Sequence, residues 1–391
     1  MNRPHRILTN LLLPSLFVLA SVVSCTSAKN NTDSIKYNNS FHPGEIWLDT
    51  DSVHINAHGG GILVQNGTYY WFGEHKTKGR GGNSALVGIS CYSSTDLYNW
   101  KNEGIALASV SDTLSDITKG CVMERPKVIF NQSTQKYVMW FHLELKGKGY
   151  SAARTGLAIS DHISGPYQYI RSLRPNQEQW PVEFNREMQE NSFDQKLEWW
   201  TPDWYKAVNN GLFVQGDFHE GQMSRDMTLF VDDDGKAYHI HSSEENLTIH
   251  ISELTDDNLD FTGRWTRIFP AGHNEAPALF KHKDNYYMIT SGCTGWDPNA
   301  ARLAMAPSIW GPWKALGNPC IGEGAELTFH AQSTFVLPVS GHADAFIFMA
   351  DRWRPKNPID GRYIWLPISF ENENPRIKWY DEWDLSVFKD Q

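Results

Sequence analysis

The segment Glu275-Ala-Pro-Ala-Leu-Phe-Lys281, followed by Tyr286-Tyr-Met-Ile-Thr290, decides how this chain folds, because the same pattern recurs along the sequence. In each copy a polar residue precedes a short apolar segment, and an aromatic-rich segment begins eleven to fourteen residues after that polar residue. Five copies occur, and they open at His58, Glu124, Asp226, Glu275 and Gln332. An internal repeat of this size indicates an architecture with one supersecondary unit per copy.

Each copy has the pattern of four short β-strands. The apolar segments are rich in β-branched and aromatic residues, and turn signals such as Gln65-Asn-Gly-Thr68 and Asp232-Asp-Asp-Gly235 divide them. Four strands in each of five copies predict an all-β fold, a five-bladed β-propeller in a single domain. A β-sandwich is the structural alternative, but regular units with equivalent inner strands favour radial repetition.

The spacing of the copies identifies an insertion. Successive copies start 66, 102, 49 and 57 residues apart, and the longest interval contains residues 176–222 with four tryptophans. Two interpretations of this insert between blades two and three are open. Either it lies over or beside the mouth of a central pocket and closes off subsites, or it packs against a blade.

The N-terminus has the pattern of an export signal. Residues 1–24 combine a basic start with an apolar stretch that is too short and too interrupted to span a membrane, and Val22-Val-Ser-Cys25 ends it. This pattern predicts a lipoprotein signal peptide that leaves Cys25 as the lipidated first residue; the alternative is an ordinary signal peptide. Polar residues 25–40 form a flexible tether to the propeller at 41–391. We therefore expect an exported bacterial lipoprotein, periplasmic or on the cell surface, attached to a membrane only through its lipid.

Composition argues against several classes of function. A net charge of −10 without a Lys/Arg block argues against nucleic acid as a partner. Sixteen Trp and fifteen Tyr side chains suit stacking on sugar faces, although filling wide cores between sheets explains most of them. The spacing of Cys91, Cys121, Cys293 and Cys320 matches no zinc motif and leaves their disulfide pairing open. Since no acidic loop has EF-hand spacing, we expect no required metal or other cofactor.

Residues at equivalent strand starts converge on one end of a propeller's channel, because the first strand of each blade lines that channel. We therefore expect one pocket to be ringed by Glu124, Asp226, Glu275 and Gln332. Crowded carboxylates raise the pKa of one member, which then stays protonated near neutrality, as the general acid of glycoside hydrolysis must. The alternative for any single carboxylate is a strand cap or an ion pair with a neighbouring arginine.

Beyond the tether, the chain resembles glycoside hydrolase family 43, whose members are inverting enzymes with five-bladed propellers. The resemblance rests on Asp226-Met-Thr-Leu-Phe-Val-Asp-Asp-Asp-Gly235 and Glu275-Ala-Pro-Ala-Leu-Phe-Lys281. It implies that Glu275 is the general acid and that Asp226 tunes its pKa. The family's general base is an Asp at the start of blade one, whereas Asn56-Ala-His-Gly-Gly-Gly61 holds no carboxylate.

A closer resemblance, to the exo-β-1,3-galactanases of subfamily 24, accounts for this departure, because that group also lacks the base Asp. The motifs that carry it are Ala57-His-Gly-Gly-Gly61, Trp71-Phe-Gly-Glu74, Glu124-Arg-Pro-Lys127, Thr294-Gly-Trp-Asp-Pro298 and Gln332-Ser-Thr334. The resemblance implies that Gln332, together with Glu124, positions the attacking water. Binding of sugar hydroxyls is the alternative role for Glu124.

Further candidates for substrate binding are Glu74, Tyr150, His58, Trp296 and Arg352. Trp296 lies in a loop flanked by glycine, where its ring can stack on galactose. Arg352 follows the second strand of blade five and is expected to reach the pocket. The alternatives are a surface carboxylate for Glu74, a packed ring for Tyr150, and a structural role for His58 in the glycine turn.

The sequence thus predicts a glycosidase that removes galactose from the non-reducing ends of β-1,3-galactan, such as arabinogalactan backbones, with inversion. One alternative is an α-L-arabinofuranosidase or β-xylosidase of the same fold, which the missing blade-one Asp disfavours. The other is a non-catalytic glycan-binding propeller, which the intact Glu275 and Asp226 disfavour.

Overall fold

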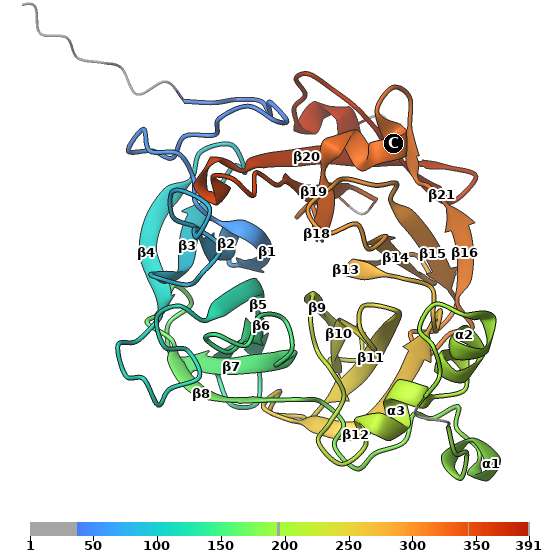
Figure 1. Ribbon diagram of the computed structural model, residues 1–391. Helices are drawn as coiled ribbons and strands as arrows, with labels where there is room; N and C mark the ends of the chain where they lie inside the picture. Colours follow the sequence, from blue (N-terminus) through green and yellow to red (C-terminus); the bar gives the residue numbers. More distant parts are fainter. Residues whose placement is uncertain (1–36, 194–195, 343, 390–391) are drawn as a thin grey trace, which may run out of the picture. The chain divides into compact units, whose positions relative to one another are not determined.

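The computed structural model describes residues 37–193, 196–342 and 344–389. Within them, five separate β-sheets surround a central axis, which confirms the predicted five-bladed propeller (Figure 1). The predicted signal peptide, Cys25 and most of the predicted tether lie outside the described residues. In the described part of the chain, no helix is long and apolar enough to cross a membrane.

The first three blades have four strands each, and every strand pairs with the next one in the sequence. Blade one contains β1 (His58–Gln65), β2 (Thr68–His75), β3 (Gly88–Ser94) and β4 (Lys101–Ala108). Blade two contains β5 (Val122–Asn131), β6 (Lys136–Glu144), β7 (Arg154–Ser160) and β8 (Gln168–Leu173). Blade three contains β9 (Met227–Val231), β10 (Ala237–Ser243), β11 (Thr248–Leu254) and β12 (Phe261–Ile268).

Blade four repeats this plan, and blade five adds a short fifth strand. Blade four contains β13 (Glu275–His282), β14 (Asn285–Ser291), β15 (Arg302–Ala306) and β16 (Lys314–Gly317). Blade five contains β18 (Gln332–Pro338), β19 (Phe346–Arg352), β20 (Arg362–Glu371) and β21 (Asn374–Lys378), and β17 (Cys320–Ile321) pairs in parallel with β21. Three 3₁₀ helices lie in connections: η1 (Ala325–His330), η2 (Pro358–Asp360) and η3 (Leu385–Phe388).

Apolar side chains fill the spaces between neighbouring blades. Where blade five meets blade one, Trp71, Trp100 and Trp365 are almost fully buried, with ring centroids 4.8–5.9 Å apart. Burial of a large apolar side chain stabilises a fold by about 1.5–3 kcal/mol, so this cluster contributes strongly to closure of the ring. Filling cores is therefore the role of these tryptophans, as expected for most of the aromatic residues.

Disulfide bonds do not hold the described part of the chain together. All four of its cysteines are free thiols: Cys91, Cys121, Cys293 and Cys320. Three of them are buried in the propeller. Packing and hydrogen bonding therefore stabilise the described part of the chain without covalent cross-links.

A repeated backbone irregularity sets the direction of two site residues. The inner strands β1, β5 and β13 each contain a β-bulge near their start. One bulge residue in each lies in the left-handed region, with φ of 61° at Gly59, 55° at Arg125 and 55° at Ala276. A bulge bends its strand and redirects side chains, and here Glu124 and Glu275 directly precede the left-handed residue and line the central cavity.

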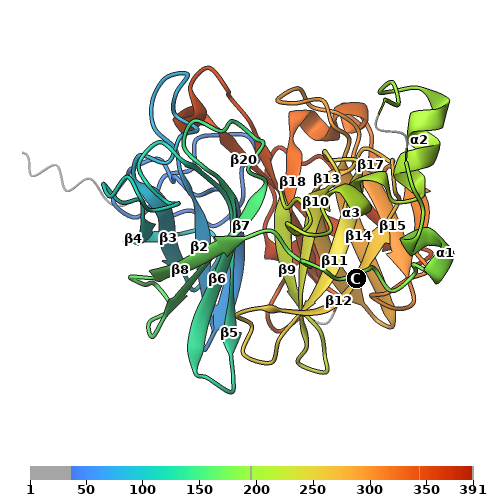
Figure 2. The ribbon, with the colours of Figure 1, turned by 60° about the horizontal axis from the view of Figure 1, so that its bottom comes forward.

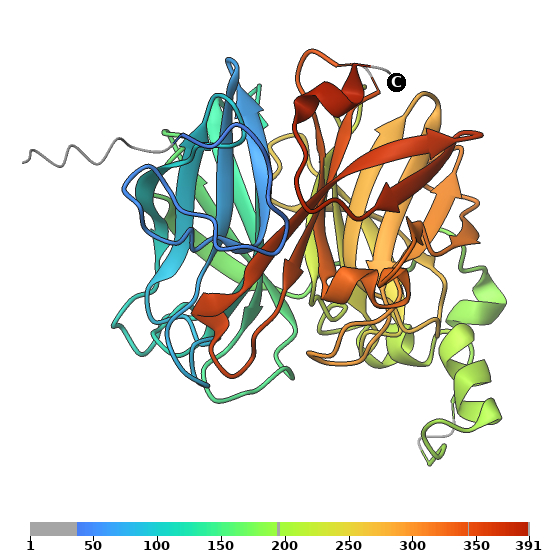
Figure 3. The same ribbon diagram turned by 90° about the horizontal axis from the view of Figure 1, so that it is seen from above.

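The insert packs against the outside of blade three. It forms three short helices, α1 (Arg186–Gln189), α2 (Pro202–Asn209) and α3 (Leu212–Gly216), which lie outside the ring of blades (Figures 2 and 3). Arg267 of β12 donates hydrogen bonds to the carbonyl oxygens of Val208 at 2.7 Å and Asn209 at 3.0 Å, at the end of α2. None of the described insert residues lines the central cavity. The structure therefore supports packing against a blade, and the described insert residues close off no part of the cavity, although α2 lies at the same end of the propeller as the cavity.

Candidate active site

One end of the central channel opens into a cavity of about 220 Å³, formed where the inner strands begin. The cavity brings together all four residues predicted from the repeat, together with Glu74, Tyr150 and Trp296. Its lining consists of Glu74, Lys76, Glu124, Arg125, His142, Tyr150, Arg225, Asp226, Asn246, Glu275, Gly295, Trp296, Gln332 and Trp353. Carboxylates, cations, amides and two indole rings therefore face one small volume.

Glu275, the first residue of β13, is placed to carry a proton. Its Oε1 accepts a hydrogen bond from Gln332 Nε2 at 3.0 Å, and its Oε2 accepts one from Asn246 Nδ2 at 3.1 Å. Burial and then the nearby charge of Asp226 raise the pKa of Glu275 to about 8. Since both causes disfavour the charged form, Glu275 is predominantly protonated at neutral pH, as a general acid must be.

Asp226 directly precedes β9 and forms an ion pair with Arg125. The two side chains meet at 2.8 Å, between Arg125 Nη2 and Asp226 Oδ2. Arg125 is almost fully buried, and its Nη1 also donates to the carbonyl oxygen of Ser333 at 3.0 Å. Asp226 therefore both pairs with an arginine and lines the pocket, two roles that the sequence analysis had treated as alternatives.

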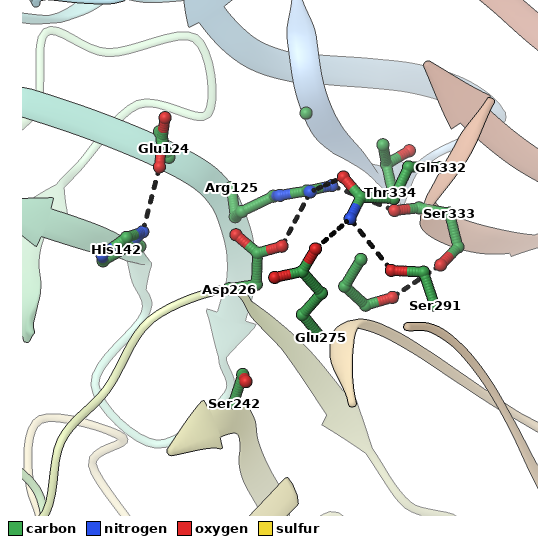
Figure 4. Close-up of polar contacts among 12 residues, drawn as sticks. Glu124, Arg125, His142, Asp226, Ser242, Glu275, Ser291, Gln332, Ser333 and Thr334 are labelled. Carbon is green, nitrogen blue, oxygen red and sulfur yellow. Dashed lines mark hydrogen bonds and ion pairs between the residues drawn. The ribbon is translucent and has the colours of Figure 1, made fainter. Parts of the chain in front are cut away.

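The amide of Gln332 lies at the centre of this network (Figure 4). Its Oε1 accepts hydrogen bonds from Arg125 Nη2 at 2.6 Å and from Trp353 Nε1 at 2.8 Å. Its Nε2 donates to Glu275 Oε1 at 3.0 Å and to Ser291 Oγ at 2.9 Å. Two donors facing the oxygen and two acceptors facing the nitrogen fix the orientation of the amide.

Glu124 is held as an anion on the blade-two side of the cavity. Its Oε1 accepts hydrogen bonds from Tyr150 OH at 2.9 Å and Asn83 Nδ2 at 2.8 Å. Its Oε2 lies 3.1 Å from His142 Nδ1, an ion-pair contact without hydrogen-bond geometry. Burial alone would raise the pKa of Glu124, but the contact with His142 and the charge of Lys76 lower it well below its usual range.

His142 lies between two carboxylates, since its other nitrogen, Nε2, is 3.0 Å from Glu144 Oε1. Burial lowers the pKa of His142, but the two carboxylates outweigh burial and raise it to about 9. Single ligand atoms of Glu124, His142 and Asp226 lie within 4.8 Å of one another, a spacing that a metal ion can bridge. A metal ligand must offer a nitrogen lone pair, however, and an imidazolium has none. A metal ion at this spacing would therefore have to displace the proton that the two carboxylates favour on His142.

Comparison with known proteins assigns the chain to a family. The profile described as "Glycosyl hydrolases family 43" matches residues 192–354. A solved structure of BT3683, a family 43 β-1,3-galactosidase with galactodeoxynojirimycin, is 57% identical in sequence and has a TM-score of 0.86. The match covers 88% of this chain and 100% of that one. The chain belongs to glycoside hydrolase family 43.

Other similar proteins are described as exo-β-1,3-galactanases or as a β-xylosidase. The exo-β-1,3-galactanases of Phanerochaete chrysosporium and Clostridium thermocellum are 33% and 34% identical, each with a TM-score of 0.71. These matches cover 90% and 88% of this chain and 70% and 66% of the two galactanases. A β-xylosidase of Bacillus subtilis (strain 168) is 26% identical over 200 residues, which is 44% of this chain but only 36% of that protein.

The resemblance to family 43 places a general base at the start of blade one, but a Cβ atom on Gly60 would lie 2.1 Å from the backbone oxygen of Phe72. A Cβ atom on Gly59 would lie 2.1 Å from Glu74 Oε1, and one on Gly61 would lie 2.4 Å from Lys127 Cδ. Heavy atoms that are not bonded do not approach so closely. Glu74, which pairs with His58 across β1 and β2, therefore fills the volume beside the glycine turn with its own carboxylate.

Two of the candidates for substrate binding lie away from the family 43 cavity. His58 is completely buried, and its ring stacks on Tyr363 with the centroids 5.2 Å apart, which fits its alternative role in the glycine turn. Arg352 lines a neighbouring cavity of about 190 Å³, and its Nη2 donates to the carbonyl oxygen of Phe329 at 2.7 Å. The neighbouring cavity shares Trp296, Gln332 and Trp353 with the first.

Sequence reasoning did not select several residues of the family 43 cavity. Lys76 directly follows β2 and contacts Glu74, and His142 lies in β6 and faces Glu124. Asn246 follows β10 and donates to Glu275. His142 could have been found, because it directly opposes Glu124 in the β5–β6 register. No comparable signal marks Asn246, which reaches the cavity from a turn.

Proposed function

We propose that this family 43 chain is an exo-acting enzyme that releases galactose from the non-reducing ends of β-1,3-galactan with inversion. The observation that supports this most strongly is the gathering of Glu275, Asp226, Glu124 and Gln332 around one cavity to which the start of β1 contributes no carboxylate. This arrangement matches the one that the resemblance to exo-β-1,3-galactanases implies. The described activities of the similar proteins agree with the same substrate.

In the proposed mechanism, Glu275 protonates the bridging oxygen of the terminal glycosidic bond. The carboxyl group is protonated in the free enzyme because burial and Asp226 raise its pKa to about 8. As the bond breaks, the proton leaves Glu275 and the resulting carboxylate gains the nearby positive charge of Arg125. The ion pair of Arg125 with Asp226 keeps that charge close to the reacting carboxyl group.

Water delivery falls to Gln332 and Glu124 in this proposal. The Gln332 oxygen already accepts two hydrogen bonds, and its nitrogen donates two, one of them to Glu275. When Glu275 turns to the glycosidic oxygen, one N–H of Gln332 is released and can hold the water. Glu124 lines the same cavity and takes up the proton as the water oxygen bonds to the anomeric carbon, since bond formation makes that water acidic enough for a carboxylate of lowered pKa; the anomeric carbon is inverted.

The size of the cavity supports an exo mode of action. About 220 Å³ suits a single terminal sugar, and Trp296 and Trp353 form one wall with their ring centroids 5.8 Å apart. Trp296 is 41% exposed, so its ring face is free to meet the substrate.

We propose that the enzyme acts outside the cytoplasm as a lipoprotein anchored through Cys25, which would place the pocket near external polysaccharide.

One experiment separates the proposed function from its alternatives. The protein is incubated with β-1,3-galactobiose, an aryl arabinofuranoside and an aryl xyloside, and product anomers are followed by NMR. Galactose appearing first as the α-anomer supports the proposal, because inversion of a β-linkage gives that anomer. Turnover of only an arabinofuranoside or xyloside would replace it with the corresponding activity. Binding without turnover of any substrate would identify a glycan-binding protein.

A further inference from the structure

Two neighbouring indole rings in the insert are exposed to solvent. The side chains of Trp199 and Trp200 are 48% and 57% exposed, whereas the nearby Trp204 is 1% exposed. Neither Trp199 nor Trp200 lines the catalytic cavity. We call this pair the Trp199–Trp200 platform. Exposed aromatic side chains that lie side by side mark an interaction site more often than isolated ones do.

The platform rests on a rigid support. Trp199 stacks on Trp204 with the ring centroids 5.1 Å apart, and Trp200 packs on the same ring at 5.0 Å. Trp204 belongs to α2, whose end is bound to blade three through the two hydrogen bonds from Arg267. Thr201 caps the start of α2 by accepting from the N–H of Trp204 at 3.3 Å. The two exposed rings are therefore preorganised.

The backbone that carries the platform is strained. Trp200 has φ of 70°, in the left-handed region that bulky residues rarely occupy. Relaxation of the chain at this point would change the direction of the indole. Backbone strain of this kind persists where the surroundings impose it, and it occurs preferentially at functional sites.

The platform is connected to the catalytic site through one loop. The ring of Trp200 stacks on His273 at 5.7 Å, and the hydroxyl of Tyr205 lies 3.0 Å from His273 Nε2. His273 precedes Glu275 by two residues, a separation of at most about 7 Å along the chain. The helix that supports the platform also lies at the end of the propeller where β13 begins (Figure 2).

We propose that the Trp199–Trp200 platform binds a stretch of the same neutral galactan chain whose end is cleaved, and so holds the polysaccharide near the pocket. This inference rests on the proposed function. A galactopyranose ring presents adjacent C–H groups on one face, which pack on an indole, while its hydroxyl groups stay in water. Asp203 and Lys206 are exposed on α2, the helix that supports the rings, and are the charged groups of that helix that can bond sugar hydroxyl groups.

The area of the platform favours a sugar chain over a protein partner. Two half-exposed indoles offer about 250 Å² in total, since a buried aromatic side chain covers about 150–250 Å². A stable protein interface needs about 800 Å² on each partner. The platform is thus too small for a protein interface and suits one or two sugar rings.

The test measures binding of Glu275→Gln protein, which cannot hydrolyse the ligand, to insoluble β-1,3-galactan. Adding Trp199→Ala and Trp200→Asn should weaken binding on the order of tenfold, the factor that 1.4 kcal/mol represents. Asn tolerates a positive φ better than Trp does, so Trp200→Asn alone should weaken binding without lowering the melting temperature. Leu114→Ala, at a side chain that is 92% exposed, is the matched control and should bind like its parent.

Activity provides the second measurement. In the otherwise unchanged enzyme, the two Trp substitutions should lower kcat/KM on long galactan several-fold and leave β-1,3-galactobiose hydrolysis unchanged, since neither ring lines the cavity that holds the terminal sugar. The proposal that the platform binds galactan would be overturned if the two Trp substitutions left galactan binding unchanged. It would also be overturned if they changed the oligomeric state of the protein and not its galactan binding. If the Glu275→Gln parent bound no galactan, platform and proposed function would both fail. Galactan binding by a wild-type protein that does not cleave it would overturn the proposed function alone.

Discussion

Asp226→Asn removes the charge that, after burial, contributes most to raising the pKa of Glu275. The substitution keeps the size of the side chain and leaves burial of Glu275 unchanged. A nearby like charge shifts a carboxyl pKa by about one to two units, so the pKa of Glu275 should fall from about 8 to between about 6 and 7. At pH 7 the protonated fraction of Glu275 would then fall from about 90% to between about 10% and 50%.

A pH profile of kcat/KM on β-1,3-galactobiose measures this shift directly, because its alkaline limb reports the general acid of the free enzyme. The limb should lie near pH 8 in the wild type and about one to two units lower in Asp226→Asn. The matched control is Asp233→Asn, at an 84% exposed side chain in the β9–β10 hairpin, which should keep the wild-type profile. An alkaline limb that stays in place or moves upward in Asp226→Asn would refute the assigned electrostatics.

Three further predictions follow from the same contacts. Gln332→Ala should lower kcat on the order of 100-fold or more with little change in melting temperature, and a kcat within a few-fold of wild type would exclude a role in holding the water. The raised pKa of Glu275 means that the free energy of unfolding of the wild type falls as pH rises from the unfolded value of 4.5 through about 8. Glu275→Gln lacks this titration, so its free energy of unfolding relative to the wild type should rise by about 2–4 kcal/mol between pH 5 and pH 8 in denaturant titrations. His142→Phe should destabilise the fold by about 3–5 kcal/mol at pH 7, because it leaves two buried carboxylates without their cation. That loss should shrink above pH 9, where wild-type His142 itself is neutral, and a pH-independent loss would argue against the imidazolium.

The repeat made the fold and the ring of site residues predictable. Strand starts in equivalent positions must converge around a propeller axis, so Glu124, Glu275 and Gln332 could be grouped without knowledge of any distance. His58 occupies the equivalent position in blade one but does not line the cavity, because its ring stacks on Tyr363. A period-two pattern gives the face of a strand on which a side chain lies, but it does not give the effect of a bulge at that position.

Contacts between blades were not predictable in the same way. The alternation of polar and apolar residues does not show that Arg125, on blade two, bonds Asp226 on blade three and Gln332 on blade five. Such contacts depend on side-chain length and on blade curvature. The insert was ambiguous for a similar reason, since a segment with four tryptophans can cover a pocket or a blade equally well. The hydrogen bonds from Arg267 to the end of α2, and the absence of the described insert residues from the cavity lining, distinguish these arrangements.

The close contact of Gly59 with Glu74 has a consequence for the evolution of this site. A mutation that restored an aspartate at Gly59 would place its Cβ within 2.1 Å of Glu74 Oε1 and would require a strained positive φ. A smaller residue at Glu74 would be needed first, and that change would remove the partner of Lys76 and of the Arg125 N–H. A base at Gly59 therefore needs a coordinated rearrangement of Glu74, whereas the arrangement of Gln332 and Glu124 can be altered by single substitutions that leave the start of β1 unchanged.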